Sequence, residues 1–278
     1  MDRTNRGVEP AFARDERLDS KIAVMPGAVN HPVTPAGADT SLEFTDTVMF
    51  QTPVATLDLA RREAQRILPP GAGGPHGPAY KMLRTQVLKR MDKLNATTLG
   101  VFSATAGEGK TLTALNLAIA IAADTARTVL LVDFDLRNPG IAPRLAYDPP
   151  MGVEECLERR CLVQQAMFKL AGYERLTIVA ARVRVEHSSE LLASMRVAEV
   201  VAEMRARYAN RIVIFDLPPV LQADDALAFA RHLQAGLLVI GEGKAKRDEV
   251  TRTLELLGDL PFVGTVLNGS RDTSSASY

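Results

Sequence analysis

The sequence lacks the net charge that would hold it to a large polyanion. Its 278 residues include 33 lysines and arginines and 33 aspartates and glutamates, so the formal net charge is zero. Neutralisation of phosphates supplies most non-specific affinity for nucleic acid, so a protein held there by bulk charge would show a basic excess. The balance excludes that class and also an acidic-tail protein. A small anionic ligand at a local site remains compatible with it.

Cysteines, histidines and long apolar runs are also scarce. The two cysteines, Cys156 and Cys161, cannot form a disulfide framework and match no zinc spacing, so we expect structural thiols in a reducing cytosol. The four histidines are scattered and form no metal pair. The longest apolar stretches, at 117–123 and 236–241, are far shorter than the roughly 18 residues of a membrane span. The first residues show no secretory signal, and we expect a cytoplasmic protein.

Composition divides the chain near residue 78. Residues 1–78 hold nine of the sixteen prolines, interleaved with glycines, and such a stretch buries little apolar surface. We expect them to be a largely disordered Pro/Gly-rich arm, with a possible short helix at 54–68 where apolar residues recur at helical spacing. Residues 79–270 are expected to form one folded domain of ordinary size. Residues 271–278 are expected to be a flexible, serine-rich tail that ends in Tyr278.

Strands and helices alternate after residue 78, which predicts an α/β fold with a mostly parallel sheet covered by helices on both faces. The expected strands are continuous Val/Ile/Leu runs, typical of strands buried on both faces. They lie at 98–103, 128–133, 176–180, 211–216, 236–241 and 262–267. Apolar residues at helical spacing predict helices at 79–94, 111–123, 197–208, 223–232 and 247–257.

The segment SATAGEGKT at 103–111 has the spacing of a phosphate-binding P-loop, with Ala104 where the first glycine would stand. Small residues and glycines let backbone N–H groups turn toward an anionic phosphate, and the following helix points its positive dipole end there. Lys110 can reach the β- and γ-phosphates, and the Thr111 hydroxyl can bind Mg²⁺. The expected strand before the loop and helix after it support this interpretation.

Two other expected strands end in acids, where an open parallel sheet binds its ligands. Asp216 ends a hydrophobic strand as a Walker B carboxylate does, to hold Mg²⁺ or its water shell. Asp133 and Asp135 lie two apart and face the same side of an extended segment. One of them can organise the metal while the other accepts a proton from an incoming hydroxyl. Arg137 is expected either to stabilise charge near the phosphates or to brace the loop against Asp135.

Together these motifs resemble those of the bacterial protein-tyrosine kinases of capsule and exopolysaccharide synthesis, which are P-loop NTPases of the deviant Walker A type. The family pattern is a P-loop close to SAxxGEGK(S/T), a Walker A′ strand ending DxDLR and a Walker B strand ending DxPP. Here the segments read SATAGEGKT at 103–111, LLVDFDLRNP at 130–139 and VIFDLPPVLQADDA at 213–226. The segments at 187–194 and 264–268 are also similar, and the resemblance spans residues 79–270.

The resemblance implies an ATP- and Mg²⁺-dependent tyrosine autokinase that regulates polysaccharide polymerisation and export. Lys110, Asp133 and Asp135 would be catalytic, with Asp133 assisting the attacking tyrosine hydroxyl. Metal ligands would be Thr111, Asp133 and Asp216, with Asp135 near the metal, and Asn268 would lie near the adenine. The residues expected around the cofactor are Ala104, Thr105, Ala106, Gly107, Glu108, Gly109, Lys110, Thr111, Leu112, Arg137 and Asn268. The usual partner is a membrane chain-length-determinant protein, whose cytoplasmic tail would hold the kinase peripherally at the inner membrane.

The sequence departs from the family at two places. The ring-forming motif ExxRxxR is replaced by Pro78, Lys81 and Arg84, so the homo-oligomer stays an open expectation. A single tyrosine, Tyr278, stands where the family carries a cluster, and it is the candidate phosphate acceptor. Two alternatives remain: a non-catalytic, nucleotide-gated scaffold for the membrane partner, and a positioning ATPase of the partition type. Thr105 occupies the place of the extra lysine of that second class. Neither nucleic acid binding nor direct membrane insertion is expected.

Overall fold

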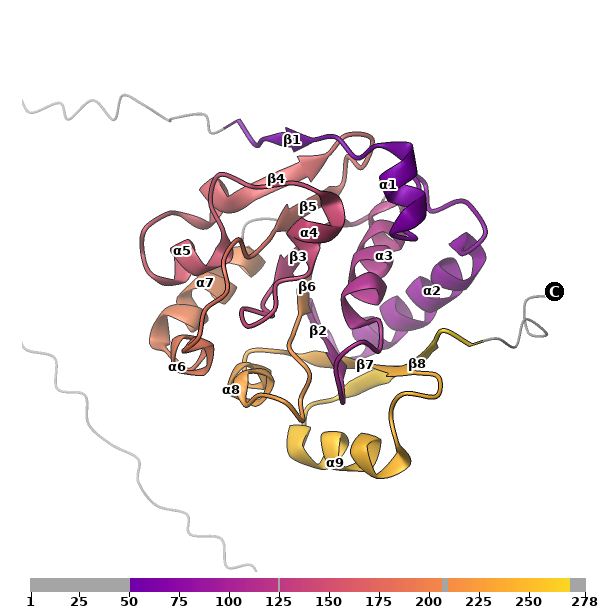
Figure 1. Cartoon of the computed structure of the whole chain (residues 1–278), viewed down its shortest axis with the longest axis vertical. Helices are drawn as coiled ribbons and strands as arrows, with labels where there is room; N and C mark the ends of the chain where they lie inside the picture. The colour runs from indigo at the N-terminus through magenta and orange to yellow at the C-terminus, as the bar shows by residue number, and fades with distance from the viewer. Residues whose placement is uncertain (1–50, 125, 207–209, 271–278) are drawn as a thin grey trace, which may run out of the picture. The chain divides into compact units, whose positions relative to one another are not determined.

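The described part of the chain folds around one mostly parallel sheet (Figure 1). The computed structural model describes residues 51–124, 126–206 and 210–270. Eight strands follow the order β1-β4-β5-β3-β6-β2-β7-β8, and the β4–β5 pair is antiparallel. The strands are β1 Val54–Ala55, β2 Thr98–Ser103, β3 Thr128–Asp133, β4 Met167–Leu170, β5 Leu176–Val179, β6 Arg211–Asp216, β7 Ala235–Gly241 and β8 Phe262–Asn268. The fold class predicted from the sequence is confirmed.

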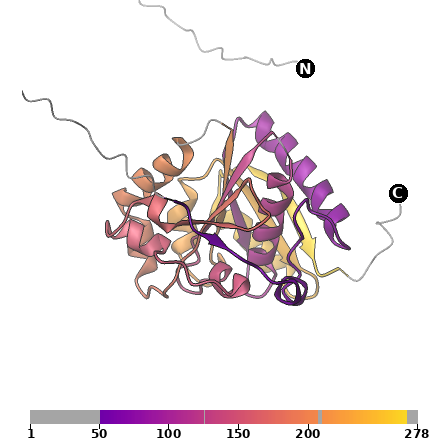
Figure 2. The same cartoon turned by 90° about the horizontal axis from the view of Figure 1, so that it is seen from above.

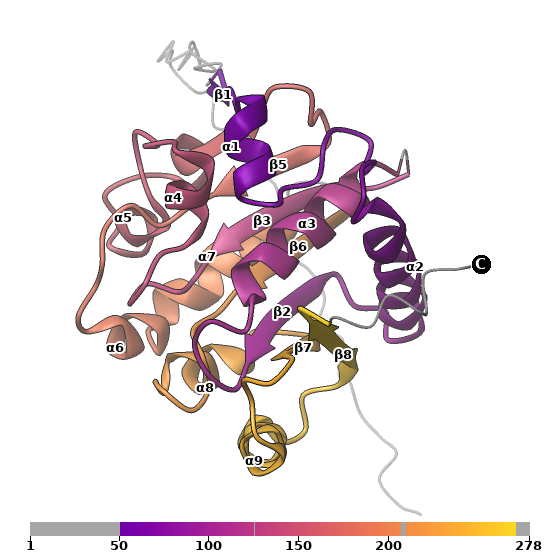
Figure 3. The ribbon, with the colours of Figure 1, turned by 45° about the vertical axis from the view of Figure 1, so that its right-hand side comes forward.

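Helices cover both faces of the sheet (Figures 2 and 3). They are α1 Leu59–Ala64, α2 Gly77–Lys93, α3 Lys110–Ala122, α4 Ile141–Leu145, α5 Val153–Leu157, α6 Ser188–Leu192, α7 Met195–Ala206, α8 Asp225–Ala230 and α9 Arg247–Leu257, with a 3-10 turn at Val163–Ala166. Side chains of β2 alternate between two apolar cores: Leu99 and Val101 pack on the side of α2 and α3, and Phe102 on the side of α7 and α8. This double burial explains why the strands read as continuous apolar runs.

The six expected strands and five expected helices are all present, with ends displaced by a few residues. The sequence did not predict β4, α4, α5 and α6, which have four or five residues each. Elements that short show too few repeats of an apolar period to be recognised.

Residues 51–78 differ most from expectation, because the structure joins them to the folded domain. β1 pairs with β4 through Val54 and Ala55, and the side chains of Ile67 and Leu68 are buried. The Leu68 N–H donates to Asn116 Oδ1 on α3 at 2.9 Å. The helix expected at 54–68 is the shorter α1. Residues 1–50 and the tail 271–278 lie outside the described residues.

Neither a membrane span nor a disulfide is found among the described residues. No helix there has both the length and the apolarity needed to cross a bilayer. Cys156 and Cys161 are free thiols, buried with their Sγ atoms 2.9 Å apart. Burial raises the pKa of the Cys156 thiol, which keeps it protonated and agrees with a structural thiol.

Candidate nucleotide-binding and phosphotransfer site

The P-loop connects β2 to α3 and has the backbone geometry that a phosphate cradle requires. Gly107 and Gly109 adopt positive φ angles of 77° and 92°, a conformation that favours glycine. Gly109 is the N-cap of α3, so the helix begins at Lys110 with its unpaired N–H groups facing the loop. The helix N-terminus and the loop together have the backbone geometry that an anion site requires.

Glu108 holds the P-loop in shape from the inside. Its side chain is buried, and Oε1 accepts hydrogen bonds from the backbone N–H (2.6 Å) and hydroxyl (3.0 Å) of Thr105. Oε2 accepts from the Gly241 N–H at 2.9 Å, which ties the loop to the end of β7. Asn268, at the end of β8, donates from Nδ2 to the Glu108 carbonyl at 2.8 Å. The Glu108 carboxylate therefore braces the loop rather than facing a ligand.

The ammonium group of Lys110 lies between two of the predicted carboxylates. Lys110 Nζ is 2.8 Å from Asp216 Oδ1 and 3.4 Å from Asp135 Oδ2, and all three side chains are buried. Burial by itself would lower the pKa of Lys110, but the charges of Asp216 and Asp135 more than offset it, and the pKa is raised overall. Lys110 is therefore a fixed positive charge at the foot of the P-loop.

Asp133 lies at the end of β3, opposite Asp216 in the β3–β6 register. Its Oδ2 accepts from the N–H groups of Gly140 and Ile141, both at 2.9 Å, and its Oδ1 from the Asp135 N–H at 3.2 Å. Burial, with the nearby Asp216 charge, raises the pKa of Asp133 to about 8. Burial likewise raises the pKa of Asp135. Two adjacent strand ends thus bring three acids and one lysine into direct proximity.

The oxygen atoms around Lys110 suit a Mg²⁺ ion that is also bound by a ligand's phosphates. Asp216 Oδ2 is buried and has no hydrogen-bond partner, which leaves a carboxylate oxygen available for a cation. The described residues contain no cluster of three or more His, Cys, Asp or Glu side chains that could hold a metal alone. Mg²⁺ is commonly bound by one or two carboxylates together with phosphate oxygens and water, so Asp216 and Thr111 fit the ion.

A pocket of about 840 Å³ opens over these groups. Its lining contains the loop and helix residues 106–111 together with Asp135, Arg137 and Gly140. Of the predicted site residues, Ala104, Thr105, Leu112, Asp133, Asp216 and Asn268 do not line it. Sequence reasoning missed its lining residues Arg61, Gln65, Arg144 and Arg184, because they come from segments with no recognisable motif.

Arg137 lines the pocket but is braced by Asp225 rather than by Asp135. Its Nε is 2.8 Å from Asp225 Oδ1, at the start of α8, and an Nη2 atom is 3.7 Å from Asp224. The hydroxyl of the buried Ser188 donates to the other Asp225 oxygen. The bracing expected of Arg137 is therefore present with a different partner.

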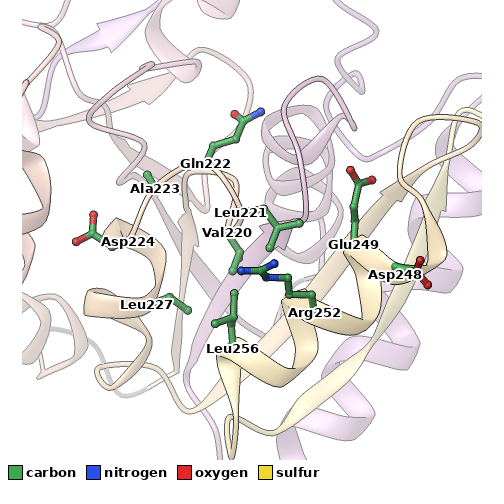
Figure 4. A pocket seen from close by; sticks show the side chains of 10 residues that line it. All are labelled: Val220, Leu221, Gln222, Ala223, Asp224, Leu227, Asp248, Glu249, Arg252 and Leu256. Atoms are coloured by element: carbon green, nitrogen blue, oxygen red, sulfur yellow. The ribbon is translucent and has the colours of Figure 1, made fainter.

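A second pocket, of about 710 Å³, lies beside the first, between α9 and the segment that leads into α8 (Figure 4). Arg252 and Leu256 of α9 point toward Val220, and Gln222 and Ala223 line both pockets. It contains no P-loop residue. Tyr278, the candidate acceptor, lies outside the described residues.

Replacement of Gly109 by alanine tests the P-loop geometry. An alanine there would have to adopt a positive φ, and its Cβ would collide with the Asn268 amide. We therefore expect Gly109→Ala to weaken nucleotide binding at least about tenfold. Gly243→Ala is the matched control, since Gly243 has a φ of 68° but open space around it. Titration of a fluorescent nucleotide measures both. Equal affinities of the two variants would contradict this cradle geometry.

No protein-family model matches the chain, but individual relatives do. The tyrosine-protein kinase YwqD of Bacillus subtilis is 28% identical over 201 residues, which cover 72% of this chain and 83% of that protein. The succinoglycan biosynthesis transport protein ExoP of Rhizobium meliloti is 32% identical over 176 residues, which cover 61% of this chain but 22% of ExoP. This chain therefore corresponds to a small part of that longer relative.

Solved structures give the same result. The kinase domain of the Escherichia coli tyrosine kinase ETK is similar with a TM-score of 0.63 and 27% identity, over 72% of this chain and 79% of that one. The VpsO kinase domain is similar with a TM-score of 0.61 and 28% identity, over 68% of this chain and 92% of that one. The fold and its phosphate loop define a protein of the P-loop class. Within that class, the chain is a homologue of the bacterial tyrosine-protein kinases, as its three motifs predict.

Proposed function

We propose that this chain is an ATP-dependent protein-tyrosine kinase that phosphorylates itself and regulates the polymerisation and export of a polysaccharide. One observation carries the proposal: Lys110 of the P-loop makes ion pairs with both Asp135 and Asp216, so the three motifs meet in one buried cluster. The names of YwqD and ETK as tyrosine-protein kinases, and of ExoP as a biosynthesis transport protein, support this activity and setting.

In this proposal the P-loop and Lys110 hold the β- and γ-phosphates of ATP. Mg²⁺ would be held by Thr111, Asp216 and either Asp133 or Asp135, and would neutralise phosphate charge. The tyrosine hydroxyl gives its proton to a carboxylate, its oxygen bonds to the γ-phosphorus, and the bond to the β-phosphate oxygen breaks to leave ADP. We assign the proton to the ionised form of Asp133, because this carboxylate ends β3 beside Asp216 and its raised pKa makes it a stronger base.

The proposal also includes a membrane partner, a location and a homo-oligomer for the kinase. A membrane chain-length-determinant protein would bind it through a cytoplasmic tail, which would place the kinase at the inner membrane from the cytoplasmic side. A homo-oligomer would let the tail of one copy reach the pocket of another. Tyr278 would be the acceptor in that tail.

Mapping of phosphotyrosine by mass spectrometry tests the proposal. The full chain would be expressed with its membrane partner, supplied with Mg-ATP and compared with Lys110→Met. We expect phosphotyrosine that depends on Lys110, with Tyr278 among the modified positions. Absence of Lys110-dependent phosphotyrosine anywhere in the chain would refute the kinase, whereas modification elsewhere than Tyr278 would refute only that acceptor.

A further inference from the structure

Three arginines line the P-loop pocket, and none of the proposed nucleotide roles uses them. Arg61 comes from α1, Arg144 from α4 and Arg184 from the loop between β5 and α6, and all three line the pocket. We call them the arginine rim. They come from three separate segments, so the fold rather than one charged run gathers them.

The arginine rim has no carboxylate partner within the described part of the chain. Arg61 donates to the backbone carbonyls of Pro143 and Arg144, and Arg144 donates to the Gln65 side chain at 3.2 Å. None of the three forms an ion pair with a described residue. Their positive charge is therefore not compensated locally.

The other charges of the pocket are already balanced. Lys110 is paired with Asp135 and Asp216, and Arg137 is paired with Asp225. The carboxylate of Glu108 accepts hydrogen bonds inside the P-loop. The net positive charge of the pocket is therefore concentrated at the arginine rim, beside the phosphate cradle rather than within it.

Sheet topology places the arginine rim away from the end of β8, where the nucleotide base is expected. β2, which leads into the P-loop, has β7 and β8 on one side and β6, β3 and β5 on the other. Asn268, the residue expected near the adenine, ends β8. Arg144 and Arg184 follow β3 and β5, and no residue of β7 or β8 lines the pocket. The pocket therefore extends from the phosphates toward the side opposite to Asn268.

We propose that the arginine rim binds acidic residues flanking the acceptor tyrosine, so that the kinase selects tyrosines in acidic peptide segments. This inference rests on the proposed kinase activity and names the substrate class of the same site. Guanidinium groups match carboxylates in charge and geometry. An arginine group beside the γ-phosphate position would hold the peptide in register while its tyrosine enters the pocket.

Binding of a labelled peptide tests the rim without requiring phosphotransfer. Fluorescence anisotropy would compare a fluorescein-labelled peptide with glutamates around one tyrosine and the same peptide with glutamines, both with a non-hydrolysable ATP analogue and Mg²⁺. We expect Arg144→Gln/Arg184→Gln to weaken binding of the acidic peptide about tenfold, since each exposed ion pair contributes a few-fold. Affinities for the glutamine peptide and for the nucleotide should change less than about twofold. Arg61 is left intact because it anchors α1 to α4.

The matched control removes two charges at the opposite end of the sheet. The two residues are Lys93, at the end of α2, and Arg175, just before β5, and both are exposed. Both precede strands, whereas Arg144 and Arg184 of the rim follow strands. Lys93→Gln/Arg175→Gln should bind the acidic peptide as the wild type does. Salt should weaken the acidic peptide's binding to the wild type more than to the rim variant.

Failure of this inference can be told apart from failure of the proposed function. Equal affinity of the rim variant and the wild type for the acidic peptide would overturn the rim, as would equal losses for the glutamine peptide or the nucleotide. In a kinase assay, equal kcat/KM for both peptides would also overturn it and leave the kinase standing. Rim-dependent binding of the acidic peptide without phosphorylation of any tyrosine would overturn the kinase and leave an acidic-peptide site.

Discussion

Replacement of Lys110 by methionine is expected to lower the rate of phosphotransfer by about 10³-fold, the loss typical of removing a preorganised charge from a developing negative centre. Lys110 is the cation that the structure holds between Asp135 and Asp216 at the start of α3. Arg137, which lines the same pocket, is held by Asp225 and so is not free to replace it. Single-turnover transfer from ATP, compared with the wild type, gives the measurement.

The same variant also leaves buried carboxylates without their cation, so loss of activity must be separated from loss of the folded state. Removal of one partner of a buried ion pair costs about 3–5 kcal/mol. Lys110→Arg keeps the charge and should keep the melting temperature closer to that of the wild type, while its larger planar group still impairs transfer. Lys93→Met is the exposed control and should be fully active. A folded Lys110→Met protein with near wild-type transfer would contradict the assigned role.

The stability of the metal-free protein is expected to fall steeply as the pH rises. The fold raises the pKa of Asp133 from 3.8 to about 8, so it favours the neutral carboxyl over the charged one. Below pH 4 the group is neutral in both states and its stabilisation is complete. As pH rises toward 8, the unfolded chain ionises first and the stabilisation is lost. We expect the free energy of unfolding to fall by about 1.4 kcal/mol per pH unit across this range from Asp133 alone.

Urea unfolding in EDTA at pH 5, 6, 7 and 8 measures this slope. The raised pKa of Asp135 acts in the same direction, so the contribution of Asp133 is the difference between the wild type and Asp133→Asn. The slope is the readout, because the asparagine amide would face the Asp135 N–H and shift the absolute stability at every pH. Parallel pH profiles for the two proteins would show that Asp133 is already ionised in the metal-free fold.

The sequence predicted the parts of the fold and site that repeat a physical pattern. Buried parallel strands read as apolar runs, and those runs end at Asp133 and Asp216, which the β3–β6 register then places side by side. The P-loop was predictable because its residue types are required by backbone geometry at Gly107 and Gly109.

Other features depend on contacts between distant segments, which no local pattern encodes. The Pro/Gly-rich composition of residues 51–78 suggested an arm, yet β1 gains its partner from β4 and Leu68 gains its hydrogen bonds from Asn116 and Tyr173. Glu108 is expected around the cofactor from its place in the motif, but Thr105 and Gly241 hold its carboxylate inside the loop. The arginine rim is similarly visible only when α1, α4 and the loop after β5 are brought together.

The fate of the γ-phosphate decides whether this chain is a kinase. The full chain would be incubated with Mg-ATP labelled at the γ-phosphate, and the label recovered on tyrosine would be compared with the label released as inorganic phosphate. We expect label on tyrosine, formed in step with ADP and absent from Lys110→Met. Release of all the label as inorganic phosphate, with none on tyrosine, would contradict it and identify a positioning-type ATPase, and bound nucleotide without turnover would identify a scaffold.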